Sequence, residues 1–252
     1  MKFSIVTSTY NSAKTLRDTF ESVLNQTYKD YEYWVIDGVS KDDTIAIIKE
    51  YEPKFEGRMK WISERDKGIY DAMNKGFMKS TGDVLMLINS DDLFARADAL
   101  QMVATKFEEN PDADCIYADL YYVSQDNVQN IVRVWKTGTQ KTFSKGWLPA
   151  HPTFYAKKTV YDKYGYFNLS YKLAADFELM LRFVEKYHIK LTYLDECLVR
   201  MRLGGATSKN LKNIYLQNKE CYKAFKDNGL KCSPFYIVYR FLPKLKQFFR
   251  RK

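Results

Sequence analysis

The chain of 252 residues has little of what small secreted or metal-stapled domains are built from. It has four cysteines, and none of them belongs to a C-x-x-C pair, which argues against a structural zinc site or a disulfide scaffold and fits a reducing compartment. No apolar run approaches the roughly 20 residues of a membrane-spanning helix. No signal peptide precedes the first predicted strand. These absences predict a cytoplasmic protein with one large domain.

The charge balance points to an anionic partner. Lysine and arginine number 40 against 31 acidic residues, which gives a net charge of +9. Such a charge suits nucleic acid, a phosphorylated substrate or an anionic membrane. We find no helix-turn-helix, zinc or RNA-binding signature in the chain, and this disfavours nucleic acid.

Strands and helices are predicted to alternate over the first 110 residues. The apolar spacing indicates strands at residues 3–8, 31–37, 60–63 and 83–88, and helices at residues 12–24, 40–48, 70–79 and 97–109. Ser12 and Ser40 are expected to cap the first two helices. Alternation of this kind is typical of βαβ units and a parallel sheet.

The second half is less regular. Strands are expected at residues 114–123, 130–136 and 191–202, a loop at residues 146–153, and helices at residues 174–187 and 211–226.

Three of the predicted parallel strands end in polar residues. These ends are residues 7–11 (TSTYN), Asp37 and residues 89–92 (NSDD). They should line one crevice, because an open α/β sheet binds ligands beyond the carboxyl ends of its strands. The adjacent carboxylates Asp91 and Asp92 repel each other unless a cation lies between them, and a metal held in this way usually holds a phosphate too.

The crevice therefore suits a nucleoside diphosphate with Mn²⁺ or Mg²⁺. The ring of Tyr10 would stack on the base, and a carboxylate would accept a hydrogen bond from the base or the ribose. Structural roles stay open for these residues: helix capping for Asn11 and Ser12, a turn for Asp37, and a solvated loop for Asp91 and Asp92.

Five motifs in the first 100 residues together resemble family 2 glycosyltransferases of the GT-A fold. They are SIVTSTYN (4–11), SVLNQTY (22–28), VIDGVSKDDT (35–44), DKGIYDAMNKG (66–76), and GD followed by NSDD (82–92). The resemblance implies an α/β fold with a Rossmann-like, mostly parallel sheet, helices on both faces and C-terminal helices. It divides the chain into a nucleotide-sugar-binding half (1–110), an acceptor and catalytic-base half (111–210) and a basic helical tail (211–252).

The resemblance also implies roles in the first half. Asp37 would contact the base and Asp66 the base or ribose, while Asp91 is favoured over Asp92 as the direct ligand of Mn²⁺ or Mg²⁺. Asn89 stands where many relatives have aspartate. The remaining residues of the nucleotide-sugar pocket would be Thr7, Ser8, Thr9, Tyr10, Gly68, Asp71, Asn74 and Ser90.

In the second half, the resemblance assigns the catalytic base to Asp176 in LAADFELMLR (173–182). Glu178 is a weaker alternative for the base and a weak candidate for contact with the acceptor. A capping role for Asp176 at the helix start is the alternative. His151 would contact the acceptor or a phosphate, or serve as a turn residue. Arg202, in a segment that resembles a flexible loop of the family (200–208), would neutralise the diphosphate.

The tail combines aromatic and basic residues. After Pro243, apolar side chains fall on one face of a predicted helix, and lysines and arginines lie elsewhere. Such a helix is typical of a membrane-surface element, and packing on the domain is the alternative. We expect residues 235–252 to dock on the inner face of a bacterial plasma membrane.

The sequence as a whole predicts a metal-dependent inverting glycosyltransferase. The expected donor is a UDP-hexose or UDP-N-acetylhexosamine. The expected acceptor is a hydroxyl in a cell-surface polysaccharide or a lipid-linked oligosaccharide. The alternatives are a nucleotidyltransferase acting on sugar phosphates, which is disfavoured because residues 7–11 lack glycine, a basic nucleic-acid-binding protein, and a catalytically silent sugar-nucleotide binder.

Overall fold

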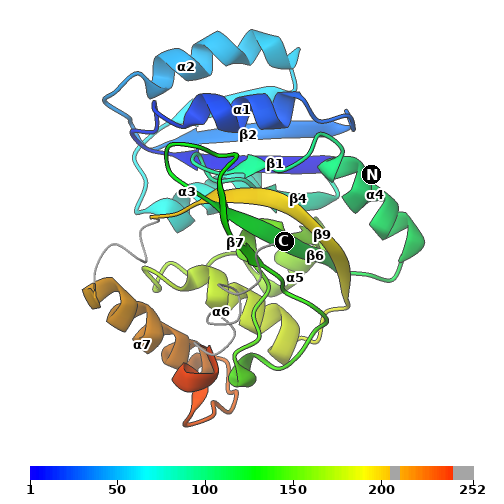
Figure 1. Cartoon of the computed structure of the whole chain (residues 1–252), viewed down its shortest axis with the longest axis vertical. Coiled ribbons are helices and arrows are strands. Elements are labelled where there is room, and N and C mark those ends of the chain that lie inside the picture. Colours follow the sequence, from blue (N-terminus) through cyan, green and yellow to red (C-terminus); the bar gives the residue numbers. More distant parts are fainter. Residues whose placement is uncertain (205–210, 241–252) are drawn as a thin grey trace.

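A computed structural model describes residues 1–204 and 211–240 (Figure 1). Its strands form one sheet in the order β3-β2-β1-β4-β8-β6-β9-β5, with β7 paired to β6. Their bounds are β1 (Phe3–Thr9), β2 (Tyr31–Asp37), β3 (Met59–Ser63), β4 (Val84–Leu87), β5 (Leu93–Phe94), β6 (Cys115–Val123), β7 (Ile131–Trp135), β8 (Phe154–Lys157) and β9 (Leu191–Arg202).

The first four strands are parallel to one another, as the alternating pattern predicts. β1 and β4 are buried along their whole length, in keeping with continuous apolar runs in parallel sheets. The register pairs Thr9 with Asp37 and Asp37 with Ser63. The polar ends of β1, β2 and β3 therefore lie side by side, and β4 pairs with β1 on its other edge.

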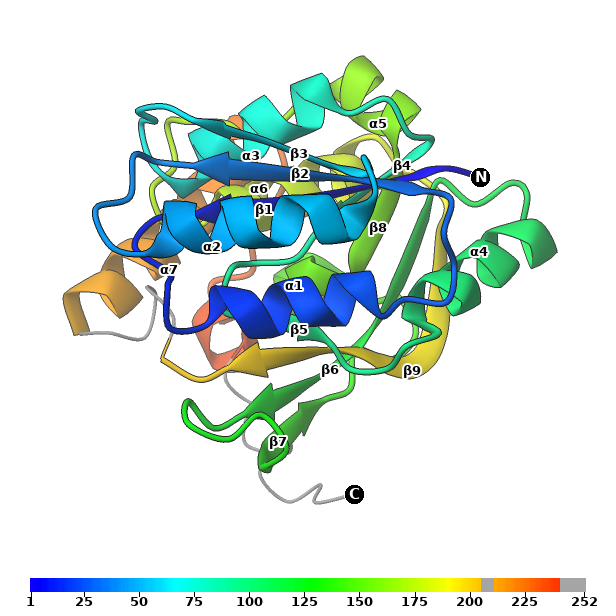
Figure 2. The same ribbon diagram turned by 90° about the horizontal axis from the view of Figure 1, so that it is seen from above.

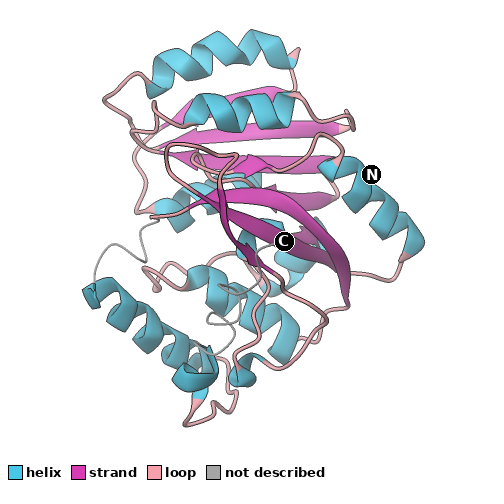
Figure 3. Cartoon of the chain, in the orientation of Figure 1, coloured by secondary structure: helices cyan, strands magenta, loops and turns pink. Residues whose placement is uncertain are grey.

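Helices cover both faces of the sheet (Figures 2 and 3). One hydrophobic cluster joins the sheet to α1 (Leu16–Leu24), α2 (Thr44–Tyr51) and α4 (Ala99–Glu109). The other cluster joins it to α3 (Ile69–Lys79), α5 (Lys158–Tyr164), α6 (Ala175–Leu181) and α7 (Leu211–Asp227). The predicted α/β class with helices on both faces is confirmed.

Short helical turns complete the elements. Three are 3₁₀ turns: η1 (Glu52–Phe55), η2 (Phe143–Lys145) and η3 (His151–Thr153). The helix expected at residues 174–187 is α6 followed by a π-helical turn, η4 (Arg182–Lys186). The loop expected at residues 146–153 contains η3.

The two predicted serine caps are wrong. α1 begins at Leu16 and α2 begins at Thr44. The Ser40 hydroxyl donates instead to Asp37 at 2.5 Å, and the Ser12 hydroxyl pairs with that of Ser90 at 2.9 Å. A carboxylate is a stronger acceptor than a neutral group, so Ser40 connects the end of β2 to its own loop rather than capping a helix.

The second half joins the first through β8, which the sequence pattern did not predict. β8 runs antiparallel to both β4 and β6, and Ala156 pairs with Leu85 on one side and Cys115 on the other. At four residues β8 is too short to show a periodic pattern. Both halves consequently share one sheet, and the predicted boundary at residue 110 falls between α4 and β6.

Helix α7 holds the segment that precedes α6 through a single carboxylate. The buried carboxylate of Glu220 on α7 accepts hydrogen bonds from the backbone N–H groups of Lys172, Leu173 and Ala174 at 2.8–2.9 Å. The first N–H groups of a helix and its flank lack partners within the helix. Glu220 therefore satisfies donors at the start of α6 from a distant part of the chain.

We predict that Glu220→Gln lowers the free energy of unfolding by about 1–3 kcal/mol, because its amide nitrogen would face backbone donors. Denaturant unfolding would measure the loss. The control is Glu196→Gln, at an exposed ion pair with Arg96, which should cost less than about 1 kcal/mol. Equal effects of the two substitutions would contradict the capping role.

Candidate functional site

The loops after β1 and β2 are tied together by hydrogen bonds. The Gly38 N–H donates to the Thr9 carbonyl at 2.9 Å. The Asn11 N–H donates to the Ser40 hydroxyl, and the Lys41 N–H donates to the Asn11 side chain, both at 2.8 Å. Asn11 adopts a left-handed φ of 50°, which asparagine tolerates better than most residues.

Val39 carries backbone strain at the same place. Its φ is 64°, a conformation that is unusual for a β-branched residue. Such strain persists where the surrounding structure enforces it, and it is concentrated at functional sites. Val39 is also 41% exposed, so no packing requirement of the core explains it.

Gly38 lies between two of the predicted nucleotide contacts. A Cβ atom added to Gly38 would lie 2.7 Å from the Asp66 carboxylate and 3.4 Å from the Tyr10 ring. The Tyr10 side chain is 59% exposed. The Asp66 carboxylate and the Tyr10 ring thus lie against bare backbone at Gly38, and these three residues are here called the slot. Gly38 is not among the predicted site residues, although its position directly after Asp37 was a signal in the sequence.

Two predicted pocket residues are turned into the protein. Asp37 is fully buried and accepts hydrogen bonds from Ser40 and from the Ser63 hydroxyl at 2.6 Å. The Thr7 hydroxyl donates to the Ile88 carbonyl at 2.7 Å. Both side chains therefore connect strand ends to each other.

The hydroxyls of Ser8 and Thr9 are different. Both are buried and have no hydrogen-bond partner among the described residues. A buried polar group without a partner is costly, so these two hydroxyls at the end of β1 would gain from a hydrogen bond that a ligand supplied.

Residues 89–92, here called the acidic segment, follow β4. The Asn89 amide donates to one oxygen of Asp92 at 2.8 Å, and the other oxygen of Asp92 has no partner among the described residues. Burial and the charge of Asp91 raise the pKa of Asp92 well above its usual range. Burial likewise raises the pKa of Asp91, against the opposing charge of Arg202.

The acidic segment fits a divalent cation. Within residues 1–204 and 211–240 no group of three or more His, Cys, Asp or Glu side chains could hold a metal alone. However, Mg²⁺ is commonly held by one or two carboxylates, with waters and substrate phosphates as its other ligands. A desolvated carboxylate pair with one free oxygen suits this arrangement.

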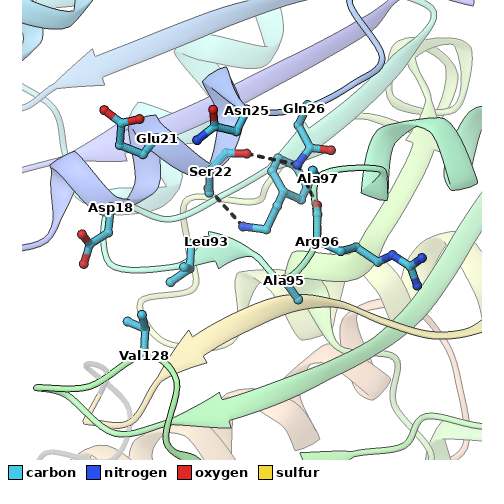
Figure 4. A pocket seen from close by; sticks show the side chains of 11 residues that line it. Asp18, Glu21, Ser22, Asn25, Gln26, Leu93, Ala95, Arg96, Ala97 and Val128 are labelled. Atoms are coloured by element: carbon cyan, nitrogen blue, oxygen red, sulfur yellow. Dashed lines mark hydrogen bonds between the residues drawn. The ribbon is translucent and has the colours of Figure 1, made fainter.

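Helix α1 supports the acidic segment and the residues that follow it. The Thr19 hydroxyl donates to the Asp92 carbonyl at 2.7 Å, and the Ser22 hydroxyl accepts from the Phe94 N–H at 3.1 Å. Gln26 donates to the Arg96 carbonyl at 2.9 Å. Figure 4 shows the side chains that line a hollow between α1 and residues 93–97. Its volume is about 320 Å³, and none of the predicted nucleotide-sugar or metal residues lines it.

Arg202 has a different place from the one predicted. It is the last residue of β9 rather than part of a flexible loop, and it is 5% exposed. Its guanidinium pairs with Asp18 and donates to the Asp91 carbonyl at 2.6 Å. Arg202 thereby fixes the backbone of the acidic segment. The rest of the predicted loop, residues 205–208, lies outside the described residues.

Asp176 lies in the first turn of α6 and remains partly exposed. The Tyr70 hydroxyl donates to one of its oxygens at 3.1 Å, and Nδ1 of His151 lies 3.4 Å from the other. Burial lowers the pKa of His151, although the charges of Asp176 and Asp91 oppose this shift. His151 therefore contacts the predicted base, and the charge of Asp91 also acts on its pKa.

Two predicted residues, Glu178 and Asn74, make structural contacts. Glu178 is buried and pairs with Arg182 at 2.9 Å and Asn228 at 3.1 Å, so an acceptor role for Glu178 is not supported. Asn74 makes two hydrogen bonds to the backbone of Phe167.

At the start of α3, the Asp71 carboxylate accepts from the Lys67 N–H at 2.9 Å, and Asp66 accepts from the Gly68 N–H at 2.8 Å. Asp71 therefore closes the first turn of the helix, and Gly68 fixes the orientation of the slot carboxylate. Ser90 contributes its hydroxyl to Ser12 and its carbonyl to Thr15.

We predict that Asp92→Asn stabilises the metal-free protein at pH 7 by about 1–3 kcal/mol. A carboxyl whose pKa is higher in the folded than in the unfolded chain destabilises the fold as it ionises, so this gain should shrink toward pH 4. Thermal unfolding in chelator would measure it. Asp112→Asn, at an exposed residue, is the control, and destabilisation by Asp92→Asn at pH 7 would contradict the prediction.

Known proteins with sequences similar to this chain are named as glycosyltransferases. It is 29% identical over 180 residues to a PGL/p-HBAD biosynthesis glycosyltransferase of Mycobacterium bovis, covering 71% of this chain and 68% of the relative. It is 31% identical over 184 residues to an uncharacterized glycosyltransferase of Mycobacterium tuberculosis, covering 71% and 67%.

Solved structures share the fold. TarS of Staphylococcus aureus, crystallised with UDP, has a TM-score of 0.68 at 18% identity, covering 100% of this chain and 71% of TarS. The mannosyltransferase PcManGT of Pyrobaculum calidifontis, in complex with GDP-Man and Mn²⁺, has a TM-score of 0.67 at 17% identity, covering 96% and 69%. The predicted GT-A fold is thus confirmed. Residues 4–168 match glycosyl transferase family 2, and the chain belongs to this family of enzymes.

Proposed function

We propose that the enzyme transfers a sugar from a nucleoside diphosphate to an acceptor hydroxyl, with a divalent metal and with inversion at the anomeric carbon. The observation that carries this proposal is the position of His151, which lies 3.4 Å from Asp176 and is acted on by the charge of Asp91. The proposed base and the proposed metal-binding carboxylates would then flank one region, in which the reacting groups would meet.

Family membership decides against the nucleotidyltransferase and nucleic-acid alternatives. The donor class is supported by the structural neighbours, since TarS was solved in complex with UDP and PcManGT in complex with GDP-Man. We take a UDP-hexose or UDP-N-acetylhexosamine as the donor. Its base would enter the slot of Tyr10, Gly38 and Asp66, where stacking and a carboxylate acceptor favour a nucleobase.

The diphosphate would lie beside the acidic segment. Asp91 and Asp92 would hold Mn²⁺ or Mg²⁺, which when bound offsets the charge that develops on the departing diphosphate. The free hydroxyls of Ser8 and Thr9 would contribute hydrogen bonds to the donor. Asp37 would act through the loop it fastens, because its own oxygens are taken by Ser40 and Ser63.

The chemical step would be a single in-line displacement. Asp176 would take the proton from the acceptor hydroxyl as that oxygen attacks the anomeric carbon. The bond from this carbon to the diphosphate oxygen would break on the opposite side. No covalent enzyme intermediate is needed, and the anomeric configuration inverts.

We predict that Asp176→Asn abolishes turnover and leaves donor binding intact, because only the proton acceptor is lost. Asp91→Ala should instead lose the metal-dependent part of donor binding. A thermal-shift panel of UDP-, GDP- and dTDP-sugars with and without Mn²⁺ would identify the donor, and release of the nucleoside diphosphate would measure turnover. Full turnover by Asp176→Asn would overturn the base assignment.

We also propose that residues 235–252 dock the enzyme on an anionic membrane that presents a lipid-linked saccharide. No helix within residues 1–204 and 211–240 is long and apolar enough to cross a bilayer. Of residues 235–252, the structure describes 235–240, and residues 236–240 form a helical turn. Tyr236 is buried against Phe177 and Phe225, whereas Phe235 and Val238 are 63% and 54% exposed.

The amphipathic helix predicted after Pro243 lies outside the described residues. Its sequence places Lys244, Lys246, Arg250, Arg251 and Lys252 directly after the exposed apolar positions. Apolar side chains beside basic ones favour binding to anionic lipid headgroups. The enzyme would bind the cytoplasmic face of the membrane, because nucleotide-sugar donors are made in the cytoplasm.

We predict that the double substitution Phe235→Ser with Val238→Ser weakens binding to phosphatidylglycerol vesicles by about tenfold or more, because two apolar side chains no longer enter the interface. Vesicle sedimentation of the full chain would measure this. Tyr215→Ser, at a residue 70% exposed on α7, is the control. No binding by the unaltered chain, or equal binding to phosphatidylcholine vesicles, would contradict an anionic docking site.

A further inference from the structure

Asp176 has a partner in the other half of the domain. Tyr70 lies on α3, 106 residues away in the chain, and its hydroxyl donates to Asp176 at 3.1 Å. Burial and the charge of Asp176 raise the pKa of Tyr70 well above its usual range, so the hydroxyl keeps its proton and remains a donor. The contact is therefore a phenol donating to a carboxylate.

The position of Tyr70 is itself constrained. Its ring packs on Phe167 with centroids 5.4 Å apart. One turn later on the same helix face, Asn74 exchanges two hydrogen bonds of 2.9 Å with the backbone of Phe167. Tyr70 and Asn74 thus join α3 to the second half through one anchor, and the Tyr70 hydroxyl has little freedom to move.

The same helix begins at the nucleotide slot. Asp66, whose carboxylate lies over Gly38, accepts the Gly68 N–H directly before α3. A single rigid segment, residues 66–74, therefore carries a slot residue at its start and the partner of Asp176 one turn later. The motif at residues 66–76 connects the site of the donor with the site of proton removal.

We propose that Tyr70 is a positioning residue that holds the carboxylate of Asp176 in the orientation needed to accept the proton of the attacking hydroxyl. His151, 3.4 Å from the other oxygen, bounds the carboxylate on its second side. A hydrogen bond to one oxygen leaves lone pairs on the other for the incoming proton. This inference rests on the proposed role of Asp176 as the base.

The test is Tyr70→Phe, which removes the hydroxyl and keeps the ring on Phe167. Donor hydrolysis, with water in place of the acceptor, would be measured for the nucleotide-sugar that the thermal-shift panel identifies. We expect kcat to fall about tenfold to a hundredfold, because small misplacement of a catalytic group is costly. The donor Kd and the melting temperature should stay unchanged. The control is Tyr166→Phe, which removes a tyrosine hydroxyl bonded to Asp162 at 2.7 Å on the surface.

The outcomes separate the two proposals. Unchanged kcat in Tyr70→Phe, with Asp176→Asn inactive, would overturn the positioning role and leave the base assignment standing. Full turnover by Asp176→Asn would overturn the base assignment, and the positioning role with it. A loss of donor affinity or of thermal stability in Tyr70→Phe that accounts for the lower rate would also overturn the positioning role, because it would make Tyr70 a structural or donor-binding residue.

Discussion

Asp91 and Asp92 are two adjacent carboxylates with little access to water at the end of β4, and the surrounding structure is organised around holding them there. Burial and mutual repulsion disfavour their ionised forms. Asn89 donates to one carboxylate, Arg202 fixes the segment's backbone and α1 supports it from the side. None of these contacts neutralises both charges, and this is the property that suits the segment to the cation we propose for it.

The second organising feature is the joining of two halves across a single sheet. β8 inserts between β4 and β6, α7 caps the start of α6 through Glu220, and α3 reaches Asp176 through Tyr70. The proposed base is therefore oriented by residues from the donor half and from the C-terminal helix. An enzyme that must align a donor with an acceptor gains from such cross-links, because the two sites then keep a fixed geometry.

Several site residues were predictable because their chemistry is local. A buried strand followed by two carboxylates, and three polar strand ends in a parallel sheet, indicate a crevice without any knowledge of distant contacts. The roles of Asn74, Glu178 and Arg202 were not predictable in this way. Each of these side chains bonds to a partner that the fold brings close. Asn74 bonds to Phe167, and Arg202 pairs with Asp18. Glu178 pairs with Arg182 and accepts from Asn228.

The sequence by itself determined the alternation of strands and helices in the first half, the polar strand ends and the family to which the chain belongs. These follow from short-range patterns of apolar and polar residues. Only the tertiary structure decided that Gly38 floors the slot between Tyr10 and Asp66, and that Tyr70 and His151 flank Asp176. Such contacts join residues many positions apart, and no local pattern records which side chains the folded sheet will bring together.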